Sequence, residues 1–95
     1  MVCTQDRSEV RLLISEAQGS DAEVADAAAG RLISENLGLV KSIARRFLGR
    51  GCEYDDLVQI GTIGMLKAIR SFDLERGTAF STYAVPMIIG EVRRY

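Results

Sequence analysis

The chain has 95 residues, of which 12 are Lys or Arg, 13 are Asp or Glu and none is His. This length is enough for one domain with a single core, but not for a core and a deep catalytic cleft as well. Because histidine is absent, the sequence holds no histidine base and no zinc ligand set, and we expect neither an enzyme nor a metal or cofactor site.

Charge and hydropathy indicate where the protein acts. Residues 1–36 are acidic overall and residues 37–95 are basic, although the formal net charge is only −1. The longest uncharged apolar run, residues 84–90, is interrupted by Pro86 and is too short to span a bilayer. The N-terminus lacks the basic-then-apolar order of a signal peptide. We therefore expect a cytoplasmic protein with no membrane partner, in which Cys3 and Cys52 are reduced thiols.

Apolar periodicity predicts an all-α fold, a compact bundle of about four helices. The first short helix follows Asp6 and Glu9, which resemble a capping box, and it ends at Gly19. Ser20, three residues before an acidic side chain, gives a second capping signal. A long helix is predicted from there to Phe47.

Glycines inside the predicted helices indicate where a helix bends or packs closely against another. Gly30 and Gly38 weaken the long helix, so we expect it to bend or to pack closely at one of them. A third helix opens at Tyr54 or Asp55 and closes near residue 71. Within it, the small residues Gly61 and Gly64 predict the close approach of another helix.

The last helix is predicted to begin near Ser81, because Ser81 and Thr82 are good N-cap residues. Pro86 requires this helix either to kink or to start again with Pro86 in its first turn. The helical pattern still runs at Tyr95, so we expect a fragment of a longer protein.

Two aromatic residues, Phe80 and Tyr83, lie at the N-terminus of this helix with two small hydroxyl residues between them. Their spacing leaves two interpretations open. Aromatic pairs near helix ends commonly belong to the core, but they also serve as platforms for unstacked bases. Spacing alone favours the core and leaves both interpretations open; a role in binding DNA requires the second, in which both rings face outward.

Three sequence blocks, in this order and spacing, resemble the sigma-70 family of bacterial RNA polymerase sigma factors. They are residues 36–40 (NLGLV), 56–68 (DLVQIGTIGMLKA) and 80–84 (FSTYA). The run from Tyr83 to Tyr95 (YAVPMIIGEVRRY) is most similar to the sporulation branch, the sigma-F and sigma-G types. The resemblance is specific over about residues 30–95 and weaker over residues 6–29. It implies an N-terminal helix in residues 1–20 and a second-region helical domain in residues 21–95, truncated within the helix that reads the minus-ten element.

The resemblance also implies a function. In this family the second region binds core RNA polymerase and then recognises and melts the promoter minus-ten element, here of sporulation genes. The residues that match the contact with the β′ clamp helices are Asp56, Gln59, Ile60, Thr62 and Leu66. A polar rim around apolar anchors suits such a helix-on-helix interface.

For promoter DNA, the resemblance implies contacts by Lys67, Phe80, Ser81, Thr82, Tyr83, Arg93 and Arg94. The arginines at positions 45, 46 and 50 are expected to attract phosphates, which is the sequence-independent part of DNA affinity. Housekeeping members carry two tryptophans where this chain has Pro86 and Met87, which implies an altered promoter preference.

Two other functions are compatible with the sequence. The first is a regulatory interaction domain that docks an anti-sigma factor or the polymerase without productive promoter contact. The second is a generic helical DNA-binding domain. The long predicted helix and the absence of a tight turn between two short helices count against a simple helix-turn-helix.

Overall fold

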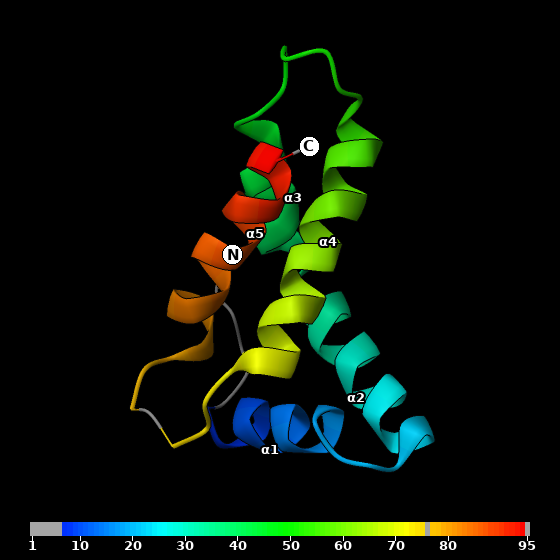
Figure 1. Ribbon diagram of the computed structural model, residues 1–95, viewed down its shortest axis with the longest axis vertical. Helices are drawn as coiled ribbons and strands as arrows, with labels where there is room; N and C mark the ends of the chain where they lie inside the picture. The colour runs from blue at the N-terminus through cyan, green and yellow to red at the C-terminus, as the bar shows by residue number, and fades with distance from the viewer. Residues whose placement is uncertain (1–6, 76, 95) are drawn as a thin grey trace.

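A computed structural model describes residues 7–75 and 77–94, which fold into five α-helices (Figure 1). They are α1 (Arg7–Ala17), α2 (Ala22–Glu35), α3 (Leu37–Arg45), α4 (Tyr54–Ser71) and α5 (Phe80–Arg94). No strand occurs among the described residues, so the all-α prediction is confirmed, with one helix more than the expected four or so. None of the helices described has the length and hydropathy needed to cross a membrane.

The centre of the molecule is the pair of helices α4 and α5, which pack along each other (Figure 1). Helix α3 packs mainly on α4, while α1 lies across one end of the bundle and packs on α2 and α4. All five helices contribute to one apolar core, whose largest fully buried side chains are Ile14, Leu32, Val40, Leu57, Met65, Ile69 and Ile88. Helix α1 is therefore part of the same core as the rest.

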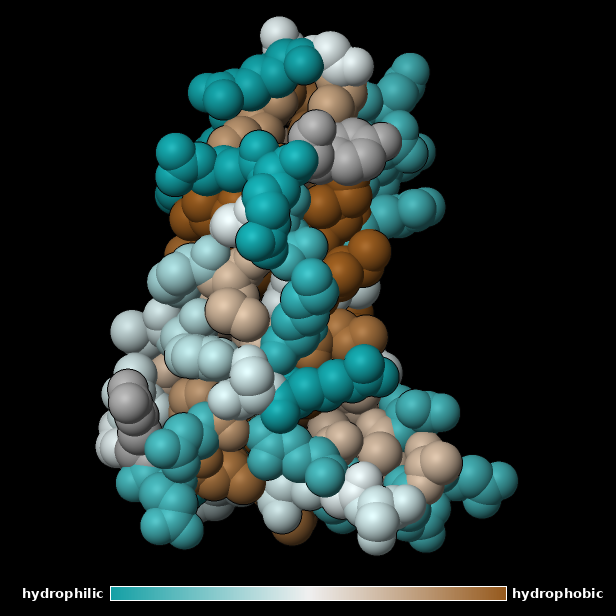
Figure 2. Space-filling view, viewed as in Figure 1, coloured by the Kyte–Doolittle hydropathy of each residue, from teal (hydrophilic) through white to brown (hydrophobic). Residues whose placement is uncertain are grey.

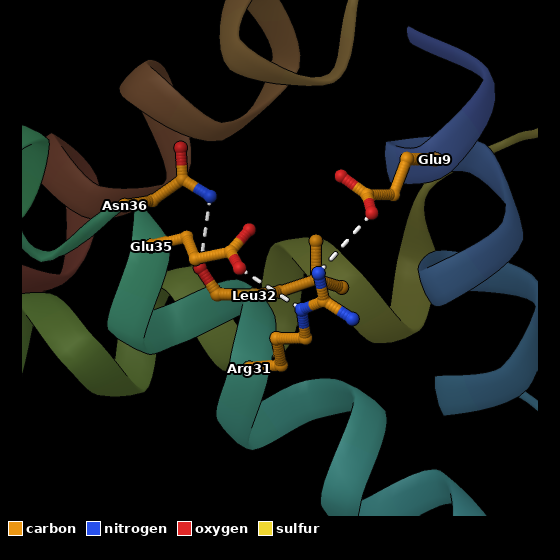
Figure 3. A network of polar contacts seen from close by, with 5 residues as sticks. All are labelled: Glu9, Arg31, Leu32, Glu35 and Asn36. Carbon is orange, nitrogen blue, oxygen red and sulfur yellow. Dashed lines mark hydrogen bonds and ion pairs between the residues drawn. The ribbon is translucent and has the colours of Figure 1, made fainter. Parts of the chain in front are cut away.

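The long helix predicted for residues 20–47 is two helices that meet at Asn36. Its φ of −111° and ψ of 13° are not helical, and its side-chain amide donates a hydrogen bond of 2.8 Å to the carbonyl of Leu32 (Figure 3). Asparagine ends a helix in this way because its side chain competes for backbone partners. The segment does break, but at Asn36 and not at a glycine, and the prediction of close packing at Gly30 or Gly38 is wrong, since a Cβ at either position would meet open space.

The starts of α2, α4 and α5 agree with the predicted signals to within one residue, whereas α1 and α3 end two residues before the predicted Gly19 and Phe47. Asp21, not Ser20, caps α2, and its carboxylate accepts hydrogen bonds from the next helical N–H groups. Helix α4 begins at Tyr54, as predicted. Helix α5 begins at Phe80, one residue early, and continues through Pro86 as one helix. The capping role predicted for Asp6 lies outside the described residues.

The prediction of close helix packing at Gly61 and Gly64 is confirmed. Both glycines are buried where α4 crosses α5. A Cβ added to Gly64 would lie 2.8 Å from the Cα of Ile88 and 2.9 Å from the carbonyl oxygen of Met87. A Cβ added to Gly61 would lie 2.8 Å from a methyl group of Val40 on α3. The distance between α4 and α5 therefore depends on a bare backbone at these positions.

Polar contacts from α1 and from Gln18, the residue that follows it, hold the end of α4. The side-chain amide of Gln18 donates hydrogen bonds of 2.9 Å to the carbonyls of Ile69 and of Phe72, in the last turn of α4 and just after it. The guanidinium of Arg11 donates to the carbonyl of Leu74 in the loop that follows. Because these carbonyls have no partner within a helix that ends here, α1 fixes the course of the chain from α4 towards α5.

A second set of contacts joins α1 to α2. Arg31 on α2 forms ion pairs with Glu9 on α1 at 3.1 Å and with Glu35, one turn further on, at 2.9 Å (Figure 3). The hydrogen bond to Glu35 raises the pKa of the Arg31 guanidinium. All three side chains remain accessible to water, so these pairs orient α1 more than they stabilise the fold.

Candidate protein and nucleic-acid interfaces

The side of α4 that points away from the core carries all five residues predicted to contact the polymerase. Asp56 and Gln59 are exposed. Ile60, Thr62 and Leu66 are half-buried, and the Thr62 hydroxyl donates to the carbonyl of Val58 within the helix at 2.8 Å. The structure thus brings the five residues to one face, with Thr62 at its edge.

Ile63 lies at the middle of this face and was not among the predicted contact residues. Its side chain is 48% exposed, and it follows Asp56 by seven residues and Gln59 by four. Figure 2 shows hydrophobic residues along α4, bordered by hydrophilic ones. The sequence signal was present, because Ile63 shares the helical spacing of its neighbours. We call Asp56, Gln59, Ile60, Ile63 and Leu66 the α4 face.

The α4 face continues into a shallow groove towards α2. Leu66 lines this groove, which has a volume of about 290 Å³, together with small side chains of α1 and α2 and the side chain of Arg70. The remaining lining residues are Ala17, Ala25, Asp26, Ala29, Gly30, Ile33 and Ile69.

The two aromatic residues at the start of α5 have different environments. Phe80 is only 7% exposed, and its ring meets the buried ring of Phe72 edge-on, with 5.4 Å between centroids. The hypothesis that both rings face outward is therefore wrong for Phe80, because its ring is buried in the core against Phe72, the residue that follows α4. Tyr83 is half-buried, lies 5.5 Å from Phe72, and shares a hydrogen bond of 2.7 Å with the hydroxyl of Ser71.

Beside Tyr83, a pocket of about 450 Å³ opens between the end of α4 and the start of α5. Its walls are Ser71, Phe72, Asp73, Thr78, Thr82, Tyr83, Pro86 and Met87. This volume is within the range of small-molecule sites, and the walls combine aromatic faces with hydroxyl groups. Ser81 is exposed on the same turn of α5 but is not one of the lining residues.

The cations predicted to contact DNA fall into two groups. Lys67 on α4 and Arg94 on α5 both contact the Oε2 atom of Glu91, at 2.8 Å and 2.5 Å. The hydrogen bond from Lys67, followed by that from Arg94, keeps the pKa of Glu91 below its ordinary value. Lys67 lies one turn before Ser71, so this ion cluster lies near the pocket beside Tyr83.

Arg93 points elsewhere and joins the basic end of the molecule. It lines a small pocket with Phe47, Cys52 and Arg50, and the Arg50 guanidinium lies 5.3 Å from the centre of the Phe47 ring. Arg45 and Arg46 are exposed at the end of α3, next to the same loop. Phosphate contacts by these arginines would thus involve a different part of the surface from the pocket beside Tyr83.

Comparison with known proteins identifies the family of the chain. The family model described as Sigma-70 region 2 matches residues 32–95. The chain belongs to this family. The match runs from the last turn of α2 to the end of the chain and includes the α4 face, the pocket and both groups of cations.

Curated relatives of this region 2 chain are sigma factors. RNA polymerase sigma-F factor of Bacillus subtilis (strain 168) is 52% identical over 92% of this chain and 32% of its own length. RNA polymerase sigma-G factor of the same strain is 51% identical over the same shares. RNA polymerase sigma-G factor of Clostridium acetobutylicum is 57% identical over 68% of this chain and 25% of the relative. The chain spans about a third of the length of the sigma-F and sigma-G relatives from Bacillus subtilis.

Helix α1 lies before the part matched by the family model, yet the contacts of Gln18 and Arg11 place it against the segment that leads into the pocket. In this region 2 structure the pocket is therefore supported by residues on both sides of the matched boundary.

Proposed function

We propose that this chain is the polymerase-binding and promoter-opening region of a sporulation-type sigma factor, an initiation factor without catalysis of its own that acts in the cytoplasm. The family match and the relatives named sigma-F and sigma-G support the class. One structural observation carries the proposed mechanism. Tyr83, which is half-exposed, and several hydroxyl groups line a pocket between the end of α4 and the start of α5.

On the DNA side, the pocket beside Tyr83 receives one unpaired base of the minus-ten element. Stacking on a ring is worth about 1–3 kcal/mol per base and accepts any base. The hydroxyls of Thr82 and Thr78 line the same space and supply donors or acceptors for a base edge. Phe80 contributes by holding Phe72, the back wall of the pocket, and not by touching DNA. Pro86 and Met87 replace aromatic wedges with smaller apolar walls.

On the protein side, the α4 face binds the polymerase, with the β′ clamp helices as the expected partner. Ile63 supplies an exposed apolar anchor, while Asp56 and Gln59 supply a polar rim. Truncating a central anchor costs far more than truncating the rim.

A pull-down of core RNA polymerase tests the protein side. Ile63→Asp is expected to abolish recovery of the polymerase. Val24→Asp is the matched control, because Val24 on α2 is similarly exposed, at 43%, but lies away from the α4 face. Equal recovery with both variants would place the interface elsewhere.

Binding of a single-stranded oligonucleotide that carries a minus-ten-like sequence, with core polymerase present, tests the DNA side. Tyr83→Phe keeps the ring and is expected to bind like the unchanged chain, whereas Tyr83→Leu loses at least about fivefold in affinity. Polymerase recovery by Tyr83→Leu shows that it is folded. The alternative, docking on a polymerase or an anti-sigma factor without promoter contact, predicts equal affinities for all three proteins.

A further inference from the structure

The ion cluster of Lys67, Glu91 and Arg94 brings together two cations that the sequence assigned to DNA and one carboxylate that it did not. The three residues come from two helices, and both cations meet the same oxygen atom, Oε2 of Glu91. Lys67 and Arg94 remain accessible, with side chains 54% and 74% exposed, while Glu91 is only 14% exposed.

The position of Glu91 is fixed by packing. Its Cγ atom lies 3.1 Å from the point where a Cβ would stand on Gly64, so the missing side chain of Gly64 makes room for it. Glu91 is therefore held in the seam between α4 and α5. The flexible cations can leave it for another anion, but the carboxylate cannot follow them far.

From this geometry we infer that Glu91 acts as an internal substitute for a DNA phosphate and thereby lowers the affinity of the chain for DNA. When a phosphate binds Lys67 or Arg94, it must displace a carboxylate that already holds them. Glu91 is thus an affinity-setting residue, which keeps the net charge of the cluster at one positive instead of two. The inference rests on the proposed function, because it takes the bound anion to be promoter DNA.

The chemistry of the cluster favours phosphate over a second protein surface. Lysine and arginine contacts with phosphate release counterions and are individually weak, so one internal carboxylate is enough to compete with them. Exposed ion pairs are also weak and exchange easily. Glu91 therefore lowers the affinity of the chain for DNA without preventing DNA from binding.

The test measures oligonucleotide binding in the presence of core polymerase, as in the preceding section. Glu91→Gln keeps the shape of the side chain and removes its charge, and it is expected to tighten binding by about threefold to tenfold. The dependence of log affinity on log salt is expected to become steeper by roughly 0.7, the contribution of one further phosphate on a single strand. Glu75→Gln, which removes an equal charge from the loop between α4 and α5, is expected to change affinity by less than about twofold.

Combining substitutions distinguishes competition from a general effect of charge. In a Lys67→Gln/Arg94→Gln background, the gain from Glu91→Gln should disappear, because there is no cation left to release. The inference is overturned if Glu91→Gln leaves affinity unchanged or weakens it, or if the same gain appears in that background or with Glu75→Gln.

These outcomes separate this inference from the proposed function. If the Lys67→Gln/Arg94→Gln variant binds more weakly than the unchanged chain while Glu91→Gln has no effect, the cations contact DNA and only the role of Glu91 is wrong. If Lys67→Gln/Arg94→Gln binds as tightly as the unchanged chain, both the inference and the DNA role of these cations fail.

Discussion

Substituting Gly64 by alanine is expected to push α4 and α5 apart. The new Cβ would stand 2.8 Å from the Cα of Ile88 and 2.9 Å from the carbonyl of Met87, and both are backbone atoms that cannot rotate away. Overpacking of this kind costs about 1–3 kcal/mol. Replacing glycine inside a helix returns at most about 1 kcal/mol. The free energy of unfolding should therefore fall, by up to about 2 kcal/mol.

Urea denaturation followed by circular dichroism measures this change, and two other glycines provide the comparison. Gly61→Ala meets a methyl group of Val40, which can shift, so its loss should be smaller than that of Gly64→Ala. Gly30→Ala meets open space in the exposed middle of α2 and should stabilise the chain by about 0.4–1 kcal/mol. The reasoning fails if Gly64→Ala is as stable as Gly30→Ala, because the contact between the helices would then not depend on a bare backbone.

Three further predictions concern stability. Gln18→Leu should lower the free energy of unfolding by about 1–3 kcal/mol, because it removes two hydrogen bonds to carbonyls at the end of α4; an unchanged denaturation midpoint would show that α1 does not support this turn. Phe80→Ala should cost about 3–5 kcal/mol as a core truncation and Tyr83→Ala clearly less, and the reverse order would mean that Phe80 is not the buried ring. The Lys67 contact lowers the pKa of Glu91 below its ordinary value of 4.5, so the ion cluster stabilises the fold above that pH and the stabilisation is lost as pH falls through the lowered value. When the free energy of unfolding is measured at falling pH, Glu91→Gln should lack this loss. The same loss of stability in Glu91→Gln and in the unchanged chain would argue against a stabilising role of the cluster.

The sequence was sufficient to predict what depends on local periodicity and on residue size. The apolar spacing located α4 and α5, and the pair Gly61 and Gly64 indicated close helix packing, because only small residues permit it. The break at Asn36 was missed, since a polar residue inside a continuous apolar pattern does not reveal that its side chain will cap a helix. Capping depends on competition between side chain and backbone, which periodicity does not measure.

The candidate site was predicted in outline but not in its detail. The spacing of Phe80 and Tyr83 located the start of α5, but it could not tell which ring faces the core, because that is decided by Phe72, the residue that follows α4. For the same reason Glu91 went unnoticed, since its two cations come from positions 24 residues before it and 3 residues after it. Contacts between distant segments are properties of packing, and a single sequence does not display them.

Fluorescence of 2-aminopurine tests the central claim, that the pocket beside Tyr83 receives an unpaired base. The probe replaces one base at a time in a single-stranded minus-ten oligonucleotide, and its emission is quenched when it stacks on an aromatic ring. With core polymerase present, we expect one position to be quenched by the unchanged chain and by Tyr83→Phe, and to recover its emission with Tyr83→Leu. Equal quenching with Tyr83→Leu, at every position that the chain quenches, would contradict the account.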